Sequence, residues 1–168
     1  MAITIRKGTA ADLDVFVNLL YIVRESMLVK EWFYLDSKED FRQHMASGIM
    51  ELWLAEDSGR VVGVFDLLIP GLREWNYGYA LDMTTEELIR SVNMDSVAVH
   101  PDYQGLGLQR KLLLEAEQWL SSRGNWTLLC TVHPENRFSL NNVKKLGYEV
   151  QKQLSIYGSV RYLLQKNI

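Results

Sequence analysis

The chain has 168 residues, of which 48% are hydrophobic and 23% are charged, a length and balance typical of one folded domain. Its 18 basic and 21 acidic residues give a net charge of −3 without a basic stripe, which argues against nucleic acid as the main ligand. No apolar run approaches the ~20 residues that a membrane span needs. We therefore predict a single domain over residues 1–168 that binds neither nucleic acid nor membrane.

Cysteine usage and the N-terminal residues predict a cytoplasmic location. Cys130 is the one cysteine, so the chain cannot form an internal disulfide, and we expect a reducing compartment. Residues 1–6 contain no signal-peptide h-region. Cys130 lies in the apolar stretch 126–132 without an activating neighbour, so we interpret it as a core residue rather than a nucleophile.

The first part of the chain predicts a strand and two helices. Residues 3–6 alternate as in a short strand, and apolar residues at helical spacing after Asp12 predict a helix with one buried face. Ser37 and Asp40 form the capping pattern of a second helix, which Gly48 ends.

A hairpin follows the second helix. The apolar runs 52–55 and 61–65 flank turn residues that favour a tight reversal of the chain. Residues 72–90 are less regular and contain one capping box, so we expect an insertion with one short helix.

The last part of the chain alternates strands with helices. We expect strands at 92–99, 126–132, 148–155 and 160–165, and helices at 108–120 and 136–146. The predicted fold class is therefore α/β, with a mixed central sheet of about seven strands flanked by helices, in the order β-α-α-β-β-β-α-β-α-β-β.

The segment Asp95–Leu114 joins a strand to a helix through a glycine-containing loop. Gly105 and Gly107 allow a tight turn whose N–H groups point one way, and the helix N-terminus leaves further N–H donors unpaired. Such a turn suits a pyrophosphate, and Arg110 in the first helical turn adds a charge-assisted contact.

The glycines alone leave other interpretations open. A dinucleotide-binding fold places G-x-G-x-x-G near its first strand, whereas this loop lies late in the chain and has Arg110 at the third glycine position. The P-loop string G-x-x-x-x-G-K-[ST] does not occur. From the residues alone, a plain tight turn between a strand and a helix remains an alternative.

Two longer motifs point to one family. Val97-Ala-Val-His-Pro-Asp-Tyr-Gln-Gly-Leu-Gly-Leu108 resembles the central acyl-CoA motif of the GNAT superfamily, V-x-P-x-Y-[QR]-G-x-G-x-[GA]. Asn136-Arg-Phe-Ser-Leu-Asn-Asn-Val-Lys-Lys-Leu-Gly-Tyr148 resembles the second hallmark of that family, N-x-x-[AS]-x-x-x-Y-x-x-x-G-[FY]. The motifs occur in the right order, about one β-α unit apart, and Ile5–Leu13 is similar to the N-terminal strand and first helix of the family.

The resemblance implies a GNAT fold and an N-acetyltransferase that moves an acetyl group from acetyl-CoA to a primary amine, on a small molecule, a protein N-terminus or a lysine. It implies that strand 94–99 splays from strand 126–132 and that the pantetheine arm of acetyl-CoA lies in this gap. The implied donor-binding residues are Val97, Ala98, Val99, Gln104, Gly105, Leu106, Gly107, Leu108, Gln109, Arg110, Asn136 and Ser139.

The chain departs from the family pattern at two positions. Gln109 replaces the last glycine or alanine of the first motif, and we expect its side chain to contact phosphate or to point to solvent. Val143 stands where many members have a tyrosine that protonates the leaving thiolate. Ser139, Tyr148 or a water molecule are the replacement acids. Val143 also motivates an alternative, a non-catalytic acyl-CoA-binding or sensor domain of the same fold.

Asp95 is the first candidate for the general base. It lies two residues before Val97 on one strand, so the two side chains share a face, and the N–H of Val97 is a candidate oxyanion donor. The alternative is a carboxylate that is hydrogen-bonded to the insertion without a role in proton transfer. Asp66 is a weaker candidate for the base.

We expect segments far from the acyl-CoA motif to form the acceptor pocket, because aromatic residues mixed with acids suit a cationic amine. The alternative for these aromatics is packing or a homodimer contact, and a third hypothesis for the chain is an interaction domain that uses them. The candidates are Trp32, Phe33 and Tyr34 within residues 24–36, and Trp75, Tyr77, Tyr79 and Asp82 in the insertion. His44, His100 and His133 have no ligand spacing, so we expect no metal site.

Overall fold

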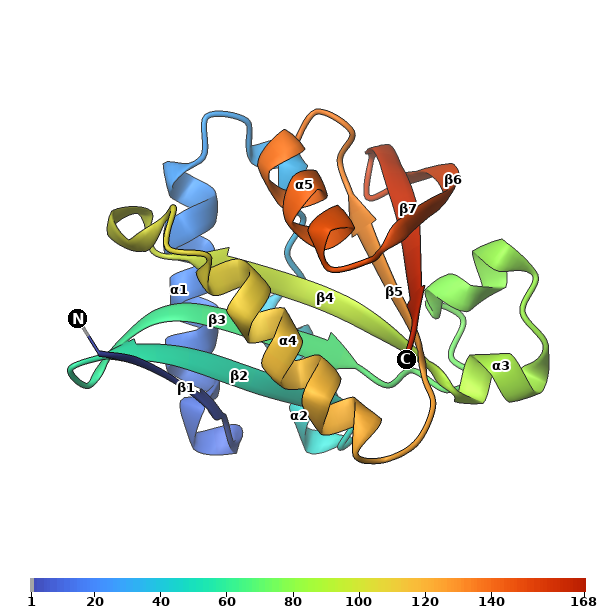
Figure 1. Cartoon of the computed structure of the whole chain (residues 1–168), viewed down its shortest axis with the longest axis horizontal. Helices are drawn as coiled ribbons and strands as arrows, with labels where there is room; N and C mark the ends of the chain where they lie inside the picture. The colour runs from blue at the N-terminus through green and yellow to red at the C-terminus, as the bar shows by residue number, and fades with distance from the viewer. Residues whose placement is uncertain (1) are drawn as a thin grey trace.

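Seven strands form one mixed sheet in the order β1-β2-β3-β4-β5-β7-β6, and helices lie on both of its faces (Figure 1). The computed structural model describes residues 2–168. The order of elements confirms the predicted α/β fold, including a short α-helix in the insertion. The strands are β1 (Ile3–Lys7), β2 (Met50–Asp57), β3 (Arg60–Leu68), β4 (Ser91–Val99), β5 (Thr127–Val132), β6 (Glu149–Ile156) and β7 (Ser159–Asn167). The helices are α1 (Leu13–Ser26), α2 (Lys38–Ala46), α3 (Thr85–Ile89), α4 (Leu108–Ser121) and α5 (Arg137–Lys145).

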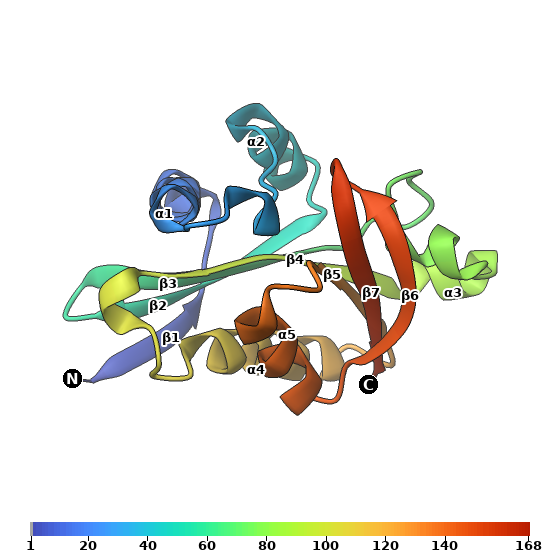
Figure 2. The same ribbon diagram turned by 90° about the horizontal axis from the view of Figure 1, so that it is seen from above.

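The larger helices form two layers around the sheet. Helices α1 and α2 cover one face, and α4 and α5 cover the other (Figure 2). Phe16, Leu20 and Phe41 are fully buried in the first layer, as are Leu112 and Leu120 in the second. Each such side chain contributes roughly 1.5–3 kcal/mol through its removal from water, so the helical spacing of apolar residues decides which face of each helix meets the sheet.

A capping box sets the start of α2 and thereby the position of the residue before it. Ser37 Oγ accepts a hydrogen bond from the N–H of Asp40 at 3.1 Å, and the Asp40 carboxylate accepts from the N–H of Ser37 at 3.2 Å. Gly48, with a φ of 73°, follows the last turn of α2, as predicted. Asp36 directly precedes this cap and ends the link between α1 and α2.

Strands β4 and β5 run parallel but pair only at their first residues, Ser91–Asn93 with Thr127–Leu129 (Figure 1). Residues 94–99 of β4 continue to pair with β3, and β5 pairs with β7. The sheet therefore opens between β4 and β5, as the family resemblance implied. Backbone groups of both strands face this gap without a partner in the sheet.

A bulge in β4 lies beside the gap. On β3 the single residue Asp66 stands opposite two residues of β4, Asp95 and Ser96. Asp95 and Val97 line the same cavity. Ser96 lies between them and also lines this cavity, which strict alternation along a strand does not allow.

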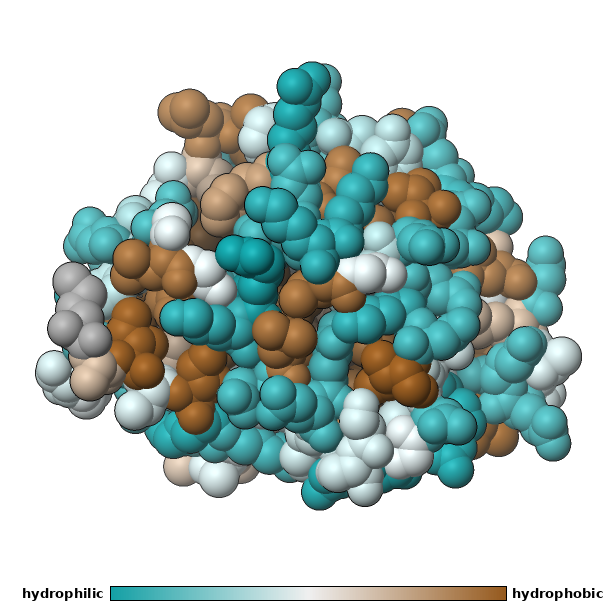
Figure 3. Space-filling model, in the orientation of Figure 1, coloured by the Kyte–Doolittle hydropathy of each residue, from teal (hydrophilic) through white to brown (hydrophobic). Residues whose placement is uncertain are grey.

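The surface carries hydrophobic residues in small groups. On the face shown in Figure 3 these groups lie between hydrophilic residues. The most exposed large hydrophobic side chains, Leu28 and Phe138, belong to the α1–α2 link and to α5. Among the described residues, no helix is both long and apolar enough to cross a bilayer. The homodimer contact remains a prediction.

Candidate active site

A cavity of about 170 Å³ lies where the gap between β4 and β5 meets the α1–α2 link and the turn between β6 and β7. Both sides of the predicted site contribute to it, because residues of the acyl-CoA motif and of the predicted acceptor pocket lie on the same walls. Its lining residues are Val23, Met27, Trp32, Phe33, Tyr34, Asp36, Tyr77, Asp95, Ser96, Val97, Ala98, Val99, Gln104, Gln109, Thr131, Val132, Asn136, Phe138, Ser139, Tyr157 and Arg161.

The glycine loop continues from this cavity to the start of α4. Gly105 and Gly107 have φ values of 81° and 72°, a left-handed conformation that glycine adopts at little cost. The hydrogen bonds of residues 2–168 include none from the N–H groups of Gly105, Leu106 or Gly107. The first turn of α4 adds further free N–H groups, beginning at Leu108. The loop therefore presents an uninterrupted run of backbone donors, which is the arrangement that an anion needs.

Arg110 places a positive charge over the same loop. Its Nη2 lies 3.5 Å from the position that a Cβ on Gly107 would occupy. Its Nε is buried and, within the described part of the chain, has no hydrogen-bond partner. The guanidinium is therefore held beside the loop with donors available for an anionic ligand.

Gln109 behaves differently from both expectations for its side chain. It is buried and points neither to solvent nor to the loop. Its Nε2 donates to Ser139 Oγ at 3.1 Å, and its Oε1 accepts from Asn142 Nδ2 at 3.0 Å. The expectation was wrong because the side chain of the second helical residue turns toward α5, where two polar groups satisfy its amide.

The three positions considered for the general acid differ in whether they line the cavity. Val143 is buried in the hydrophobic core and does not line the cavity. Tyr148 is buried, its hydroxyl donates to Glu117 Oε1 at 2.8 Å, and it does not line the cavity. Ser139 does line the cavity, and Asn136 Oδ1 accepts from its backbone N–H at 3.2 Å to cap α5. Of the two side chains considered, only Ser139 therefore faces the site.

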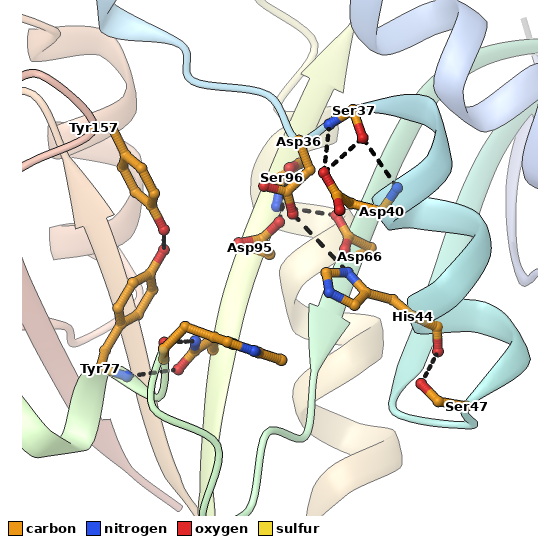
Figure 4. A network of polar contacts seen from close by, with 12 residues as sticks. Asp36, Ser37, Asp40, His44, Ser47, Asp66, Tyr77, Asp95, Ser96 and Tyr157 are labelled. Atoms are coloured by element: carbon orange, nitrogen blue, oxygen red, sulfur yellow. Dashed lines mark hydrogen bonds and ion pairs between the residues drawn. The ribbon is translucent and has the colours of Figure 1, made fainter.

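Three carboxyl groups gather at the bulge of β4, from three separate elements (Figure 4). Asp36 comes from the α1–α2 link, Asp66 from β3 and Asp95 from β4. Asp95 Oδ2 accepts from Ser96 Oγ at 3.0 Å, and Asp66 Oδ1 accepts from the N–H of Ser96 at 3.0 Å. These partners lie on β4, so the hydrogen bonds described for Asp95 do not involve the insertion.

Burial and mutual repulsion perturb the titration of these carboxyls. Loss of solvation and, to a smaller extent, the charge of Asp36 raise the pKa of Asp95 to about 7, while the Ser96 hydroxyl and Arg161 oppose the shift. Asp66 is fully buried, and the same loss of solvation raises its pKa well above the usual range. We therefore expect Asp95 to be divided between its protonated and charged forms at neutral pH.

Aromatic side chains close the cavity on the side away from the glycine loop. The rings of Tyr34 and Tyr157 stack with centroids 4.0 Å apart and planes at 11°. The hydroxyls of Tyr157 and Tyr77 lie 2.6 Å apart, and this pair also appears in Figure 4. Two segments that are distant in the sequence therefore meet in this wall, the α1–α2 link and the β6–β7 turn.

The predicted acceptor residues divide into two groups. Trp32, Phe33, Tyr34 and Tyr77 line the cavity, as expected. The insertion residues Trp75, Tyr79 and Asp82 do not line it, so their assignment to the pocket was wrong. The reason is that two of these side chains have partners elsewhere. The ring of Trp75 packs near His44 at 5.3 Å, and the hydroxyl of Tyr79 donates to the carbonyl of Leu72.

The cavity residues that the sequence interpretation did not name include Tyr157 and Arg161, and Asp36 was covered only as part of the segment 24–36. The sequence pattern of β7 could have identified Arg161. It lies two positions before the fully buried Leu163, so its side chain occupies an inward position of the strand. A charged residue at an inward position is rare without a function or a partner.

The histidines and the cysteine have structural surroundings. His44 faces Asp36 at 3.9 Å, His100 contacts Arg60, and His133 stacks near Trp32. Cys130 is buried in the core, and burial raises the pKa of its thiol to about 12, which confirms the core interpretation. No set of three or more His, Cys, Asp or Glu side chains within residues 2–168 is arranged to hold a metal ion.

The comparisons with known proteins place the chain in a family. Residues 20–148 match the model of the acetyltransferase (GNAT) family, so the chain belongs to this family, as the two sequence motifs predicted. The curated L-amino acid N-acyltransferase MnaT of Escherichia coli K12 is 36% identical over 64 residues. This match spans 38% of the chain and 37% of that relative.

Solved structures show the same fold. Arabidopsis thaliana NAA60 in complex with acetyl-CoA superposes with a TM-score of 0.75 at 18% identity, covering 99% of both chains. The ribosomal-protein-alanine N-acetyltransferase of Brucella melitensis gives 0.73 at 23% identity, covering 98% of this chain and 99% of that one. The putative acetyltransferase yncA of Salmonella typhimurium, solved with acetyl-CoA, gives 0.71 at 20% identity, covering 99% and 94%.

Proposed function

We propose that the chain transfers an acetyl group from acetyl-CoA to a primary amine by direct attack of the amine on the thioester. The observation that carries this proposal is one cavity that runs from the gap between β4 and β5 to Asp95, a carboxyl with a pKa of about 7. A bound thioester and a base within one cavity are what this reaction requires. Membership of the acetyltransferase (GNAT) family and the acetyl-CoA bound in two structural neighbours support the choice of donor.

On the donor side, backbone groups bind acetyl-CoA. The backbone of Val97 and Val99 pairs with the pantetheine arm as an added strand would, because β4 has no partner at this edge. The N–H groups of residues 105–110 and the Arg110 guanidinium hold the pyrophosphate. Asn136 and Ser139 face the arm from α5.

On the acceptor side, Asp95 takes a proton from the incoming ammonium, because a carboxyl of pKa about 7 is substantially deprotonated at neutral pH. The neutral amine attacks the thioester carbon, and the N–H of Val97 stabilises the oxyanion. Collapse forms the amide, breaks the C–S bond and releases a second proton from nitrogen, which passes through Ser139 or a water molecule to the leaving thiolate. The thiolate, with a pKa near ~8.5 by analogy with cysteine, is a fair leaving group without full protonation.

Ser139 or a water molecule returns a proton to the thiolate. The Ser139 oxygen accepts its hydrogen bond from Gln109, so the hydroxyl hydrogen is free to be donated toward the sulfur. A second candidate function, an acyl-CoA-binding or sensor domain, is favoured by Val143, which leaves the usual tyrosine position without a proton donor.

Free-thiol release from acetyl-CoA in the presence of a panel of primary amines tests the proposal. We expect Asp95→Asn to lower kcat by about 100-fold or more and the exposed matched variant Asp14→Asn to leave it unchanged. CoA should raise the melting temperature of the wild type and of both variants alike. A CoA-dependent rise in melting temperature without thiol release on any amine would instead establish the binding domain.

A further inference from the structure

Arg161 is the one buried cation among the cavity-lining residues, and its contacts satisfy only part of its guanidinium. The side chain is 6% exposed. Its Nε donates to Thr131 Oγ1 at 3.1 Å, and its Nη2 donates to the carbonyl of Trp32 at 3.3 Å. Its Nη1 is buried and has no acceptor within residues 2–168. The group is thus held in place by neutral oxygens with one nitrogen unused.

The charge of Arg161 is also unpaired. The ion pairs described for residues 2–168 include none with Arg161. Asp95 attracts the guanidinium electrostatically from the same cavity but forms no hydrogen bond with it. Loss of solvation lowers the pKa of Arg161, which shows that burial disfavours its charge. A buried guanidinium without a carboxylate is expensive, so an anionic group from a ligand would complete the site.

The donor does not supply that anion. The charged groups of acetyl-CoA are its phosphates, and the glycine loop with Arg110 provides a separate anion site at the start of α4. The pantetheine arm that approaches the cavity carries amides and a thioester but no charge. The anion that meets Arg161 therefore belongs to the acceptor.

We infer that the acceptor is a small amino acid whose carboxylate binds Arg161 while its amino group faces Asp95. This inference rests on the proposed function, because it names the class of amine that the same site acetylates. A zwitterionic amino acid places its carboxylate against the Arg161 guanidinium and its ammonium group against the Asp95 carboxylate. The N-terminus of a polypeptide has no carboxylate beside its amine, so the unpaired guanidinium of Arg161 favours a free amino acid over such a terminus.

Matched acceptors test this class directly. Each common L-amino acid would be compared with its α-amide, with the corresponding amine that lacks the carboxyl group, and with a short peptide that begins with the same residue. The amide is intrinsically the more reactive nucleophile near neutral pH, because less of its amine is protonated. We expect kcat/KM for the best amino acid to exceed that of its amide by about 10- to 100-fold, as the loss of a charge-assisted hydrogen bond predicts. Equal or faster turnover of amides, simple amines or peptides would overturn the inference and leave the proposed function standing.

Variants of Arg161 assign the preference to this side chain. Arg161→Gln should erase the preference for the carboxylate, mainly through KM for the amino acid, while KM for acetyl-CoA stays unchanged. Arg161→Lys should retain part of it, because the charge remains and the fork is lost. Thr131→Val, which removes the hydroxyl that accepts from Nε, should weaken the preference without changing the charge. A preference that survives in Arg161→Gln would contradict the assignment, and a misfolded variant is recognised by its melting temperature.

Equilibrium binding separates the two proposals. Calorimetric titration of the CoA-bound wild type with the best amino acid and with its amide requires no turnover. Binding of the amino acid that depends on Arg161, in a protein that releases no thiol, would support the carboxylate site and contradict the transferase. Thiol release without discrimination between amino acid and amide would support the transferase and contradict the carboxylate site.

Discussion

The side-chain amide of Gln109 donates to the hydroxyl of Ser139 and so connects the helix that follows the glycine loop with the helix across the gap. Its carbonyl oxygen binds Asn142 on the same second helix. Both helices lie on one face of the sheet beside the gap (Figure 2). One buried residue therefore sets the spacing of the two elements that approach acetyl-CoA from this face.

Removal of this connection should weaken both the fold and donor binding. In Gln109→Ala, Ser139 and Asn142 lose partners in a partly buried environment, and we expect the free energy of unfolding to fall by about 1–2 kcal/mol. KM for acetyl-CoA should rise. Urea unfolding and steady-state kinetics measure the two effects, with the exposed Gln118→Ala on the same helix as the control. A double-mutant cycle with Ser139→Ala should give a non-zero interaction energy, and strict additivity would show that the bond is inert.

The pH dependence of turnover should follow Asp95. Because its pKa is raised to about 7 and the base must be deprotonated, kcat/KM should increase with pH and level off above about pH 7. The Ser96 hydroxyl lowers this pKa by stabilising the charged form, so Ser96→Ala should move the inflection to higher pH. A pH–rate profile of the two proteins checks the direction, and an inflection that moves down would rule out this contact as its cause.

Asp66 should make the fold less stable as pH rises. Its pKa is raised in the folded protein, so between the unfolded value of about 4 and the folded value the native state binds the extra proton. The stabilisation is therefore present at low pH and is lost toward higher pH. Asp66→Asn keeps an oxygen for the N–H of Ser96 and removes the charge, so it should equal the wild type near pH 4 and exceed it near pH 8.

Urea unfolding at the two pH values measures this difference for Asp66→Asn. Asp82→Asn is a suitable control, since Asp82 is exposed and has a left-handed conformation that asparagine tolerates. A variant of Asp66 that is less stable than the wild type at pH 8 would show that the carboxyl is charged and usefully paired there.

Gly107→Ala should weaken acetyl-CoA binding by disturbing the loop. An L-residue at a φ of 72° costs about 1–2 kcal/mol, and the new methyl group would meet the Arg110 guanidinium at 3.5 Å. Gly59→Ala in the β2–β3 turn is a matched control, because Gly59 has a φ of 83° and open space around it. Both variants should lose similar stability, but only Gly107→Ala should raise the Kd for CoA. Equal Kd values would remove the loop from the donor site.

The backbone conformation of the glycine loop could be predicted from sequence because its parts are close together in the chain. The bulged strand, the loop and the first turn of α4 fall within one run from Asp95 to Arg110, and local chemistry determines each of them. Gly105 and Gly107 predicted their own conformation, since few other residues adopt it. The orientation of Gln109 was the exception, because it depends on α5, whose Ser139 lies 30 positions further along the chain.

The acceptor side could not be predicted in the same way. Arg161 bonds the carbonyl of Trp32 across 129 positions of sequence, and this contact depends on how β7 pairs with β5. The aromatic insertion appeared suitable by composition, yet only Tyr77 reaches the cavity. Composition identifies residue types that can bind an amine, whereas long-range packing decides which of these residues lie at the site.

The α1–α2 link and the β6–β7 turn meet on the acceptor side of the cavity, away from the glycine loop. Substitutions in these segments can therefore change acceptor binding separately from acetyl-CoA binding. Residues 32–36 and 157–161 carry Tyr34, Tyr157 and Arg161 and contribute no group to the glycine loop. Exchange of these two short segments between relatives should transfer the acceptor specificity and leave the affinity for acetyl-CoA unchanged. A new acceptor specificity should then require replacement of these segments and no change in β4. These segments are therefore the natural targets for directed evolution.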